Sequence, residues 1–371
     1  MQHRTSLTRT FSWIFIAAMA ISSFTGLLPV ESALAAAPSS RKTQPREEMR
    51  VEDVVKQVGD AVVTVLNFKM PPGASEPQFY GSGTGFIIDE DGHIVTNWHV
   101  TTGGDQYAVV LADGTLIQAE MIGEDPRDDL AVIKIDPNDI PAIVPFGDSD
   151  ALNPGQTIIV IGSPLGLSNT VSTGVVSSIG RTELSSQINP DCQNYANVLQ
   201  HTAAQNPGNS GGPLFNLWGE VVGVNTLGID IINGQPIQGI SFSIPSNLVS
   251  RIADQIIETG TIEAPYIGAD FVALNPAISA AYGLPVDYGM YVRSIDNDTP
   301  AADAGMEAKD ILVAVDGQEI GPARSLPLIL FDYEPEDDVE LTIIRDGKKQ
   351  TLDLTLGQTP EEVLASCQAP R

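Results

Sequence analysis

The chain has little cysteine and little histidine. Both shortages limit the disulfide bonds, metal sites and catalytic bases that it can have. Its 371 residues include 2 cysteines and 4 histidines. Cys192 and Cys367 cannot build a disulfide framework, and neither lies in a metal-ligand spacing. Nothing in the sequence fixes their separation, so one disulfide bond between them stays an open alternative. The two cysteines therefore imply no metal site.

Positive charge is also scarce. The 19 lysines and arginines are outnumbered by 47 aspartates and glutamates, which gives a net charge of −28 at pH 7. A field of this sign repels nucleic acid and anionic membrane surfaces, so nucleic acid is excluded as an expected partner. The same field would favour encounters with basic or neutral polypeptides, but a general gain in solubility is the preferred explanation of the acidic composition.

Residues 1–35 have the pattern of an export signal. Arg4 and Arg9 precede an apolar stretch over residues 11–28, and Ala33-Leu34-Ala35 offers a small-x-small cleavage site. The alternative is an uncleaved anchor, since the stretch is near the lower length limit for spanning a bilayer. Both interpretations place the remaining chain outside the cytoplasm, in the periplasm or the extracellular space, with a membrane tether only in the second.

Length and composition favour two folded domains rich in β-structure. A chain of 371 residues exceeds what one core usually organises, and its 34 glycines and 26 prolines indicate many tight turns. Turn dipeptides such as Asp91-Gly92 separate short β-rich runs, which is typical of antiparallel barrels or sandwiches. The expected strands fall in two sets, residues 61–68, 85–88, 93–96, 107–111, 130–135 and 157–161, then residues 171–178, 197–201, 213–215, 221–225 and 240–244. Two consecutive sets predict two packed barrels.

A helix should follow the second set of strands. Leu248, Ile252 and Ile256 recur at helical spacing, Ser246 or Asn247 is the expected N-cap, and Gly260 should end the helix. The expected organisation is a signal peptide at 1–35, a flexible lead-in at 36–50, a first domain at 51–260, a smaller second domain at 266–357 and a tail at 358–371.

The most informative stretch is Asn206-Pro207-Gly208-Asn209-Ser210-Gly211-Gly212-Pro213-Leu214. A serine hydroxyl becomes a useful nucleophile when a base takes its proton and backbone donors receive the oxyanion. The glycines permit a tight turn that would point the amides of Gly208, Asn209 and Ser210 toward one spot. We therefore predict Ser210 as a nucleophile and these three amides as an oxyanion hole, against the alternative of an ordinary glycine-rich turn.

Elimination among the four histidines indicates the base. His3 belongs to the leader, and His93 follows Asp91-Gly92 in a hairpin turn, where we expect an exposed imidazole. His201 closely precedes the nucleophile loop, and its strand would have to double back to present it. His99 follows the expected strand at 93–96 and can project into a cleft, so we predict His99 as the base.

A carboxylate must hold the imidazole tautomer and favour the imidazolium. Asp128-Asp129 precedes the apolar run that starts at Leu130. Asp129 adjoins this run and can be buried toward His99, whereas we expect Asp128 to be solvated. The order His99, Asp129, Ser210 puts the first two residues on one barrel and the serine on the next.

These motifs together resemble the HtrA/Deg family of exported serine proteases over residues 51–356. The resemblance rests on five ordered landmarks, Gly81-Ser82-Gly83, residues 91–100 from Asp91 to Val100, Asp129-Leu130-Ala131-Val132, Gly162-Ser163-Pro164-Leu165-Gly166-Leu167, and the run from Asn206 to Leu214. It implies a mainly β protein, with a chymotrypsin-like double β-barrel followed by a smaller α+β PDZ domain.

The chain departs from the family pattern before its nucleophile. The family usually has an aspartate, two alanines and an apolar residue, where this chain has Thr202, Ala203, Ala204 and Gln205. By resemblance, Gln205 lines the pocket for the residue before the scissile bond. An unpaired buried amide would penalise a purely apolar guest, so a preference for small aliphatic side chains is not expected to carry over unchanged.

The second domain should bind peptides. The sequence Tyr266-Ile267-Gly268-Ala269 resembles the carboxylate-binding loop of such PDZ domains, whose amides receive a peptide C-terminus beside a sheet edge. A rigid spacer without a ligand is the alternative.

The resemblance implies a serine endopeptidase that cleaves unfolded or damaged polypeptides through an acyl-enzyme, as a homotrimer or higher oligomer without a cofactor. The rival from another class is a holdase or peptide-binding adaptor with a latent protease fold.

Overall fold

The computed structural model describes residues 47–163, 170–181, 198–228, 231–232, 235–236, 238–262, 265–321 and 324–360. The predicted signal peptide, Cys192, Cys367 and most of the predicted tail lie outside these residues. In the described part of the chain, no helix is both long and apolar enough to cross a membrane.

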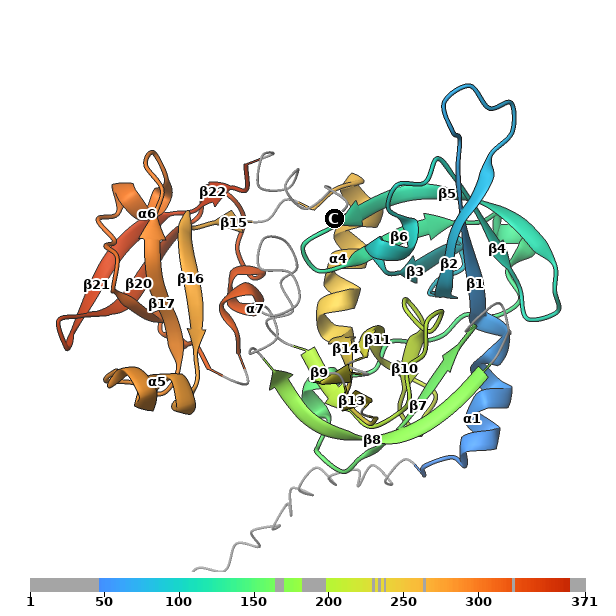
Figure 1. The fold of residues 1–371 in the computed structure, drawn as a ribbon, viewed down its shortest axis with the longest axis horizontal. Helices are drawn as coiled ribbons and strands as arrows, with labels where there is room; N and C mark the ends of the chain where they lie inside the picture. Colours follow the sequence, from blue (N-terminus) through green and yellow to red (C-terminus); the bar gives the residue numbers. More distant parts are fainter. Residues whose placement is uncertain are drawn as a thin grey trace, which may run out of the picture. The chain divides into compact units, whose positions relative to one another are not determined.

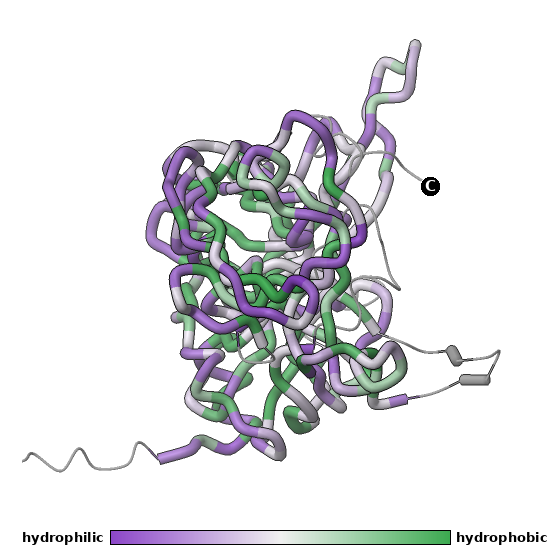
Figure 2. The backbone as a smooth tube through the Cα atoms, turned by 90° about the vertical axis from the view of Figure 1, so that its left-hand side faces the viewer, coloured by the Kyte–Doolittle hydropathy of each residue, from purple (hydrophilic) through white to green (hydrophobic). Residues whose placement is uncertain are grey.

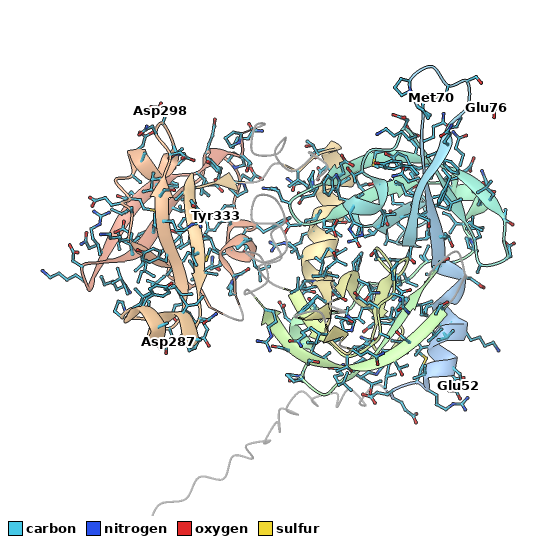
Figure 3. All side chains as sticks on the ribbon, viewed as in Figure 1. Glu52, Met70, Glu76, Asp287, Asp298 and Tyr333 are labelled. Atoms are coloured by element: carbon cyan, nitrogen blue, oxygen red, sulfur yellow. The ribbon has the colours of Figure 1, made fainter. Side chains whose placement is uncertain are left out.

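The first barrel is closed and antiparallel, with strand order β1-β2-β3-β6-β5-β4 (blue to teal in Figure 1). Its strands are β1 (Val62–Lys69), β2 (Gln78–Ile87), β3 (His93–Thr96), β4 (Gln106–Val110), β5 (Leu116–Asp125) and β6 (Leu130–Lys134). Its short helical elements are α1 (Val51–Val58), η1 (Gly59–Ala61), α2 (Trp98–Thr101) and η2 (Pro137–Asp139). The β1–β2 hairpin extends beyond the barrel and carries Met70 and Glu76 (Figure 3).

The second barrel is also closed, with strand order β10-β11-β14-β9-β8-β7. Its strands are β7 (Thr157–Gly162), β8 (Thr170–Arg181), β9 (Val198–His201), β10 (Pro213–Phe215), β11 (Val221–Gly228) and β14 (Ser241–Pro245). The turn η3 (Ser149–Ala151) precedes β7, and a small hairpin of β12 (Ile231–Ile232) and β13 (Gln235–Pro236) lies between β11 and β14. The predicted double barrel is thus confirmed. The strand expected at 157–161 was wrongly grouped with the first set, because it is β7 and pairs with β8 and β10 in the second barrel.

The helix α4 (Ser246–Thr259) follows the second barrel. Leu248, Ile252 and Ile256 are buried on one face, as their spacing predicts, and Gly260 ends the helix with φ 79°. The predicted cap was wrong, because Pro245 is the N-cap residue. The hydroxyl of Ser246 donates instead to the Gly147 carbonyl at 2.7 Å.

The C-terminal part forms a mainly antiparallel sheet with helices, which agrees with an α+β PDZ domain. Its sheet runs β16-β17-β18-β20-β21, with β19 paired to β18 and a separate pair of β15 and β22. The strands are β15 (Pro265–Tyr266), β16 (Ala269–Leu274), β17 (Gly289–Ile295), β18 (Ile311–Val315), β19 (Gln318–Glu319), β20 (Asp338–Arg345), β21 (Lys348–Thr355) and β22 (Gly357–Gln358). The helices are α5 (Pro276–Tyr282), α6 (Pro300–Asp303) and α7 (Leu326–Leu330).

Apolar side chains form separate cores. Figure 2 shows hydrophobic segments mostly in the interior of the tube and hydrophilic segments at many of its outer turns. One large cluster centres on residues such as Phe86, Phe215 and Ile252, and a separate cluster in the C-terminal sheet includes Val292, Leu312 and Leu341. Each part therefore has its own buried apolar side chains to stabilise it.

Candidate active site

His99 and Asp129 meet at one edge of the first barrel. His99 lies in α2 just after β3, and Asp129 lies just before β6, the strand that pairs with β3. The His99 Nδ1 atom is 2.9 Å from each carboxylate oxygen of Asp129. The His99 backbone N–H donates to Asp129 Oδ1 at 3.0 Å. Because antiparallel β3 and β6 end and begin side by side, two distant sequence motifs come into contact.

Asp129 is held firmly. Its side chain is fully buried, and its φ of 55° is in the left-handed region, which non-glycine residues seldom occupy. Thr226 Oγ1 donates to Asp129 Oδ2 at 2.5 Å, and Asn97 Nδ2 donates to the Asp129 carbonyl at 2.8 Å. These contacts fix a carboxylate that can orient the imidazole, as strained backbone at functional sites usually requires.

The His99 ring lies between the protein interior and the solvent. Its side chain is 37% exposed, while its Nδ1 atom faces the buried carboxylate. Burial lowers the pKa of His99, but the charge of Asp129 and the hydrogen bond to it raise the pKa further, so the net pKa lies above 6.5. With the proton of the neutral ring on Nδ1, the Nε2 lone pair is free to accept a proton.

The loop that carries Ser210 is tied to the first barrel by Thr84 of β2. Thr84 Oγ1 donates to the Gly208 carbonyl at 2.6 Å and accepts from the Ser163 N–H at 2.9 Å. The Thr84 N–H donates to the Ser210 carbonyl at 2.8 Å. A Cβ atom on Gly211 would lie 2.2 Å from the Thr84 carbonyl oxygen, so this close approach requires glycine.

Two backbone donors of the nucleophile loop remain open. The Asn209 N–H donates to the Asn206 carbonyl at 2.9 Å, which occupies one of the three amides expected for the oxyanion hole. Gly208 has φ 103°, and neither its amide nor that of Ser210 has an acceptor among the described residues. The structure thus offers two donors, at Gly208 and Ser210, rather than three.

The Ser210 hydroxyl faces β11 in this structure. Its Oγ atom donates weakly to the Thr226 carbonyl at 3.5 Å. Within the described residues, no hydrogen bond joins Ser210 to His99. Catalytic hydrogen bonds are often long before substrate binds, so this geometry keeps Ser210 as a candidate partner of His99.

The sequence predicted no role for Thr84 or Thr226. The pairing of β11 with β14 shifts register between Asn225 and Leu227, and the residue at this irregularity, Thr226, contacts both Asp129 and Ser210. Thr226 is separated from Asp129 by 97 positions, and Thr84 from Gly208 by 124. Only the closely spaced glycines 81, 83 and 85 around Thr84 gave a local signal, because they indicate close backbone approach.

The other histidines have different partners. His93 is not exposed as expected, since it is buried and its Nδ1 atom lies 2.6 Å from Asp89 Oδ2. His201 is fully buried, with Nε2 at 3.0 Å from Ser243 Oγ. These contacts support the choice of His99 as the base.

Asp128 was also expected to be solvated, but it is half-buried. Burial and the neighbouring Asp125 carboxyl raise the pKa of Asp128 well above its usual value. This environment disfavours the charge that an orienting carboxylate needs, which supports the choice of Asp129.

Gln205 lies at the start of the nucleophile loop and is partly buried. Its Nε2 atom donates to Asn225 Oδ1 at 2.9 Å and to the Phe242 carbonyl at 3.2 Å. The amide nitrogen that we expected to lack a partner is therefore satisfied by the second barrel.

The predicted peptide loop lies between β15 and β16. Gly268 has φ 85°, and the amides of Ile267 and Gly268 have no acceptor among the described residues. Tyr266 belongs to β15 and pairs with β22, whereas Ala269 begins β16. Among the described strands, β16 pairs only with β17, so within this part of the chain its other edge is open to an added strand.

No group of His, Cys, Asp or Glu in the described ranges could hold a metal ion.

Comparisons with known proteins agree with this architecture. The family model described as a trypsin-like peptidase domain matches residues 83–224, and the PDZ domain model matches residues 265–356. The chain is 36% identical over 339 residues to "Serine protease Do-like HtrA" of Bacillus subtilis, covering 85% of this chain and 74% of that protein. It is 37% identical over 294 residues to "Probable periplasmic serine endoprotease DegP-like" of Halomonas elongata, which covers 79% of this chain. The chain spans only 60% of the length of that relative.

Solved structures are similar as well. The structure titled "HtrA-type protease AlgW with decapeptide" matches with a TM-score of 0.66 and 30% identity, over 83% of this chain and 98% of that chain. The serine endoprotease from Yersinia pestis matches with a TM-score of 0.62 and 27% identity, over 85% of this chain and 100% of that chain.

Proposed function

Because the chain belongs to the HtrA/DegP family of serine proteases, we propose that it is a serine endopeptidase that cleaves unfolded or damaged polypeptides outside the cytoplasm. The observation that carries the proposal is the contact of His99 Nδ1 with the fully buried Asp129, at 2.9 Å, beside a nucleophile loop with two open amides. This arrangement supports acyl transfer rather than binding alone.

In the first half-reaction, Ser210 Oγ attacks the peptide carbonyl carbon and His99 Nε2 takes the hydroxyl proton. Asp129 stabilises the imidazolium through the Nδ1 contact, and Thr226 keeps the carboxylate in place. The carbonyl oxygen becomes an oxyanion that accepts from the Gly208 and Ser210 amides. His99 then gives its proton to the leaving amine, which breaks the peptide bond and leaves an ester on Ser210.

In the second half-reaction, water attacks the ester and gives a proton to His99. The oxyanion forms again at the same amides, and collapse releases the new carboxylate while Ser210 recovers its proton. Substrate binding must first bring the Ser210 hydroxyl from the Thr226 carbonyl toward His99 Nε2.

We propose that the PDZ domain captures peptide C-termini. The Ile267 and Gly268 amides would receive the carboxylate, and the peptide would add a strand to the open edge of β16. Tyr266 and Ala269 frame this loop at the ends of β15 and β16.

The family also supports export and self-association. Residues 1–35 would direct the chain out of the cytoplasm. By the family resemblance, Gln205 would line the pocket for the residue before the scissile bond. A homotrimer or higher oligomer is proposed from the family resemblance. Light scattering of the purified protein measures its mass and tests this assembly.

The endopeptidase proposal is tested with casein and a fluorophosphonate probe, with and without a PDZ-binding peptide. We expect the parent protein to cleave casein and to be labelled. Ser210→Ala should lose both, because the labelled oxygen is removed. A matched change of an exposed serine, Ser75→Ala, should keep both. A parent protein that neither cleaves nor labels, with or without the peptide, would overturn the proposal.

The rival function is a holdase or peptide-binding adaptor with a latent protease fold. The 3.5 Å contact of Ser210 Oγ with the Thr226 carbonyl favours it, because the nucleophile does not face its base. Suppression of casein aggregation by Ser210→Ala as strong as that by the parent protein, together with an unlabelled parent, would establish this function instead.

A further inference from the structure

Gln205 belongs to a buried polar network whose donors and acceptors can be assigned. Asn225 Nδ2 donates to the carbonyls of Gly212 at 2.8 Å and Pro213 at 3.2 Å. A carbonyl oxygen cannot donate, so the amide nitrogen of Asn225 and not its oxygen must face these two carbonyls, which fixes the orientation of the amide. Its Oδ1 atom therefore faces Gln205 and Ser243 as an acceptor.

His201 borders the same network. Ser243 Oγ donates to Asn225 Oδ1 at 3.0 Å. His201 Nε2 lies 3.0 Å from Ser243 Oγ and 3.3 Å from Gln205 Nε2, and its buried Nδ1 has no partner among the described residues. The donor and acceptor roles of the two ring nitrogens depend on the tautomer, whereas the orientations of the Asn225 and Gln205 amides follow from their carbonyl partners.

The network leaves Gln205 one orientation. Its amide nitrogen contacts Asn225 Oδ1 at 2.9 Å and the Phe242 carbonyl at 3.2 Å, and both of these atoms are acceptors. A flipped amide would place Oε1 against both, so Oε1 must point away from them. Oε1 has no donor in the described part of the chain and is not among its buried unpartnered atoms, so solvent reaches it.

The same network is joined to the nucleophile loop. The Gly211 N–H donates to the Asn225 carbonyl at 2.9 Å, and the Asn225 N–H donates to the Gly212 carbonyl at 2.9 Å. The residue that anchors Gln205 thus also anchors the two residues that follow Ser210. Gln205 therefore has a fixed position relative to the nucleophile loop, with one acceptor directed outward.

We propose that Gln205 Oε1 selects the residue before the scissile bond, favouring short side chains with an O–H or N–H donor over aliphatic side chains of equal size. The inference rests on the proposed endopeptidase function and names its substrate class. Gln205 is partly buried, so its fixed acceptor loses its water when an aliphatic side chain packs against it, and no donor replaces that water. Threonine and valine are the matched guests, because they differ by a hydroxyl in place of a methyl group.

The test uses the purified protein and two internally quenched peptides that differ only in threonine or valine before the scissile bond. We expect kcat/KM for threonine to exceed that for valine by about tenfold. Gln205→Met keeps the side-chain length but removes Oε1, so the ratio should fall to about one or below. Gln106→Met, the same change at an exposed position in β4, should keep the parent ratio.

Labelling by the fluorophosphonate probe and thermal unfolding show whether Gln205→Met is folded. The ratio measured for the parent protein tests the inference even if this variant does not fold. Cleavage of both peptides at equal rates, or faster cleavage after valine, overturns the inference and leaves the endopeptidase standing. An unchanged ratio in a folded Gln205→Met also overturns it. If neither peptide is cleaved and the probe does not label the parent protein, the proposed function fails and the inference fails with it.

Discussion

At the scale of the residue, His201 couples the stability of the second barrel to pH. Burial lowers the pKa of its imidazole from 6.5 to about 4. Below pH 6.5 the unfolded chain binds a proton at His201, while the folded chain stays neutral until about pH 4. The stability due to the neutral ring is therefore complete above pH 6.5 and is lost as the pH falls to about 4.

We predict that this single group removes about 3 kcal/mol of unfolding free energy between pH 7 and pH 4. His201→Gln keeps a donor for Ser243 but does not titrate. Its unfolding free energy should therefore fall by that much less than the parent's between pH 7 and pH 4. Urea unfolding followed by tryptophan fluorescence measures both, because Trp98 and Trp218 lie in the protease part and residues 265–360 contain no tryptophan. Equal losses in the two proteins would show that His201 titrates normally when folded.

Single residues differ in how far the sequence predicts them. His99, Asp129 and Ser210 are assigned from local motifs, and the structure brings the first two into contact. The roles of Thr84 and Thr226 could not be predicted, because their partners are more than 90 positions away, 124 for Gly208 and 97 for Asp129. A hydroxyl that is ordinary in a strand becomes part of the site only through tertiary contact.

At the scale of the element, β2 carries the link between the first barrel and the nucleophile loop. Thr84→Val keeps the shape of the side chain but removes the acceptor of the Ser163 N–H and the donor to the Gly208 carbonyl. Leaving a buried N–H without a partner costs about 1–3 kcal/mol of stability. We predict a loss of this size, together with a lower kcat on casein as the Gly208 amide loses its fixed position.

Urea unfolding and casein kinetics test Thr84→Val against Thr351→Val, an exposed change in β21. The β21 variant should match the parent protein in both measurements. Normal kcat in a destabilised Thr84→Val would mean that Thr84 supports folding without positioning the loop.

Element prediction succeeded where the local pattern was strong and failed for β5. The strands β3, β6, β7 and β10 were expected because each is a short β-rich run between turn residues. The sequence of β5, Leu116–Asp125, includes helix-favouring Ala119, Glu120 and Met121 and alternates poorly. It becomes a strand because it pairs with β4 and β6 to close the barrel, which a local pattern does not report.

At the scale of the whole molecule, the proposed peptide-bond cleavage and the proposed peptide binding lie in two parts of the chain with separate buried cores. The order of the two parts was predictable from motifs, and matches to a peptidase model at 83–224 and a PDZ model at 265–356 agree with it. Since the clusters around Phe86 and around Leu312 share no buried residue, a change in the PDZ loop should leave His99, Asp129 and Ser210 in place.

We predict that Gly268→Val abolishes peptide capture without abolishing acyl-enzyme chemistry. A Cβ atom there would lie 2.4 Å from the Thr299 Cβ atom, and φ 85° disfavours any side chain. Affinity for a peptide with a free C-terminus should fall by about tenfold or more, because its carboxylate loses the loop amides. The fluorophosphonate labelling rate should stay near that of the parent protein.

Gly347→Val is the matched control, because Gly347 also has a positive φ, 73°, but lies in the β20–β21 turn, where an added Cβ atom would have nothing within 4 Å. It should keep the peptide affinity, and an amidated peptide should bind the parent protein as weakly as the free peptide binds Gly268→Val. Unchanged affinity in a folded Gly268→Val would remove this loop as the carboxylate site. Lost labelling in the same variant would instead mean that Ser210 reacts only when the PDZ loop is intact, so that capture and cleavage are one linked function of the chain.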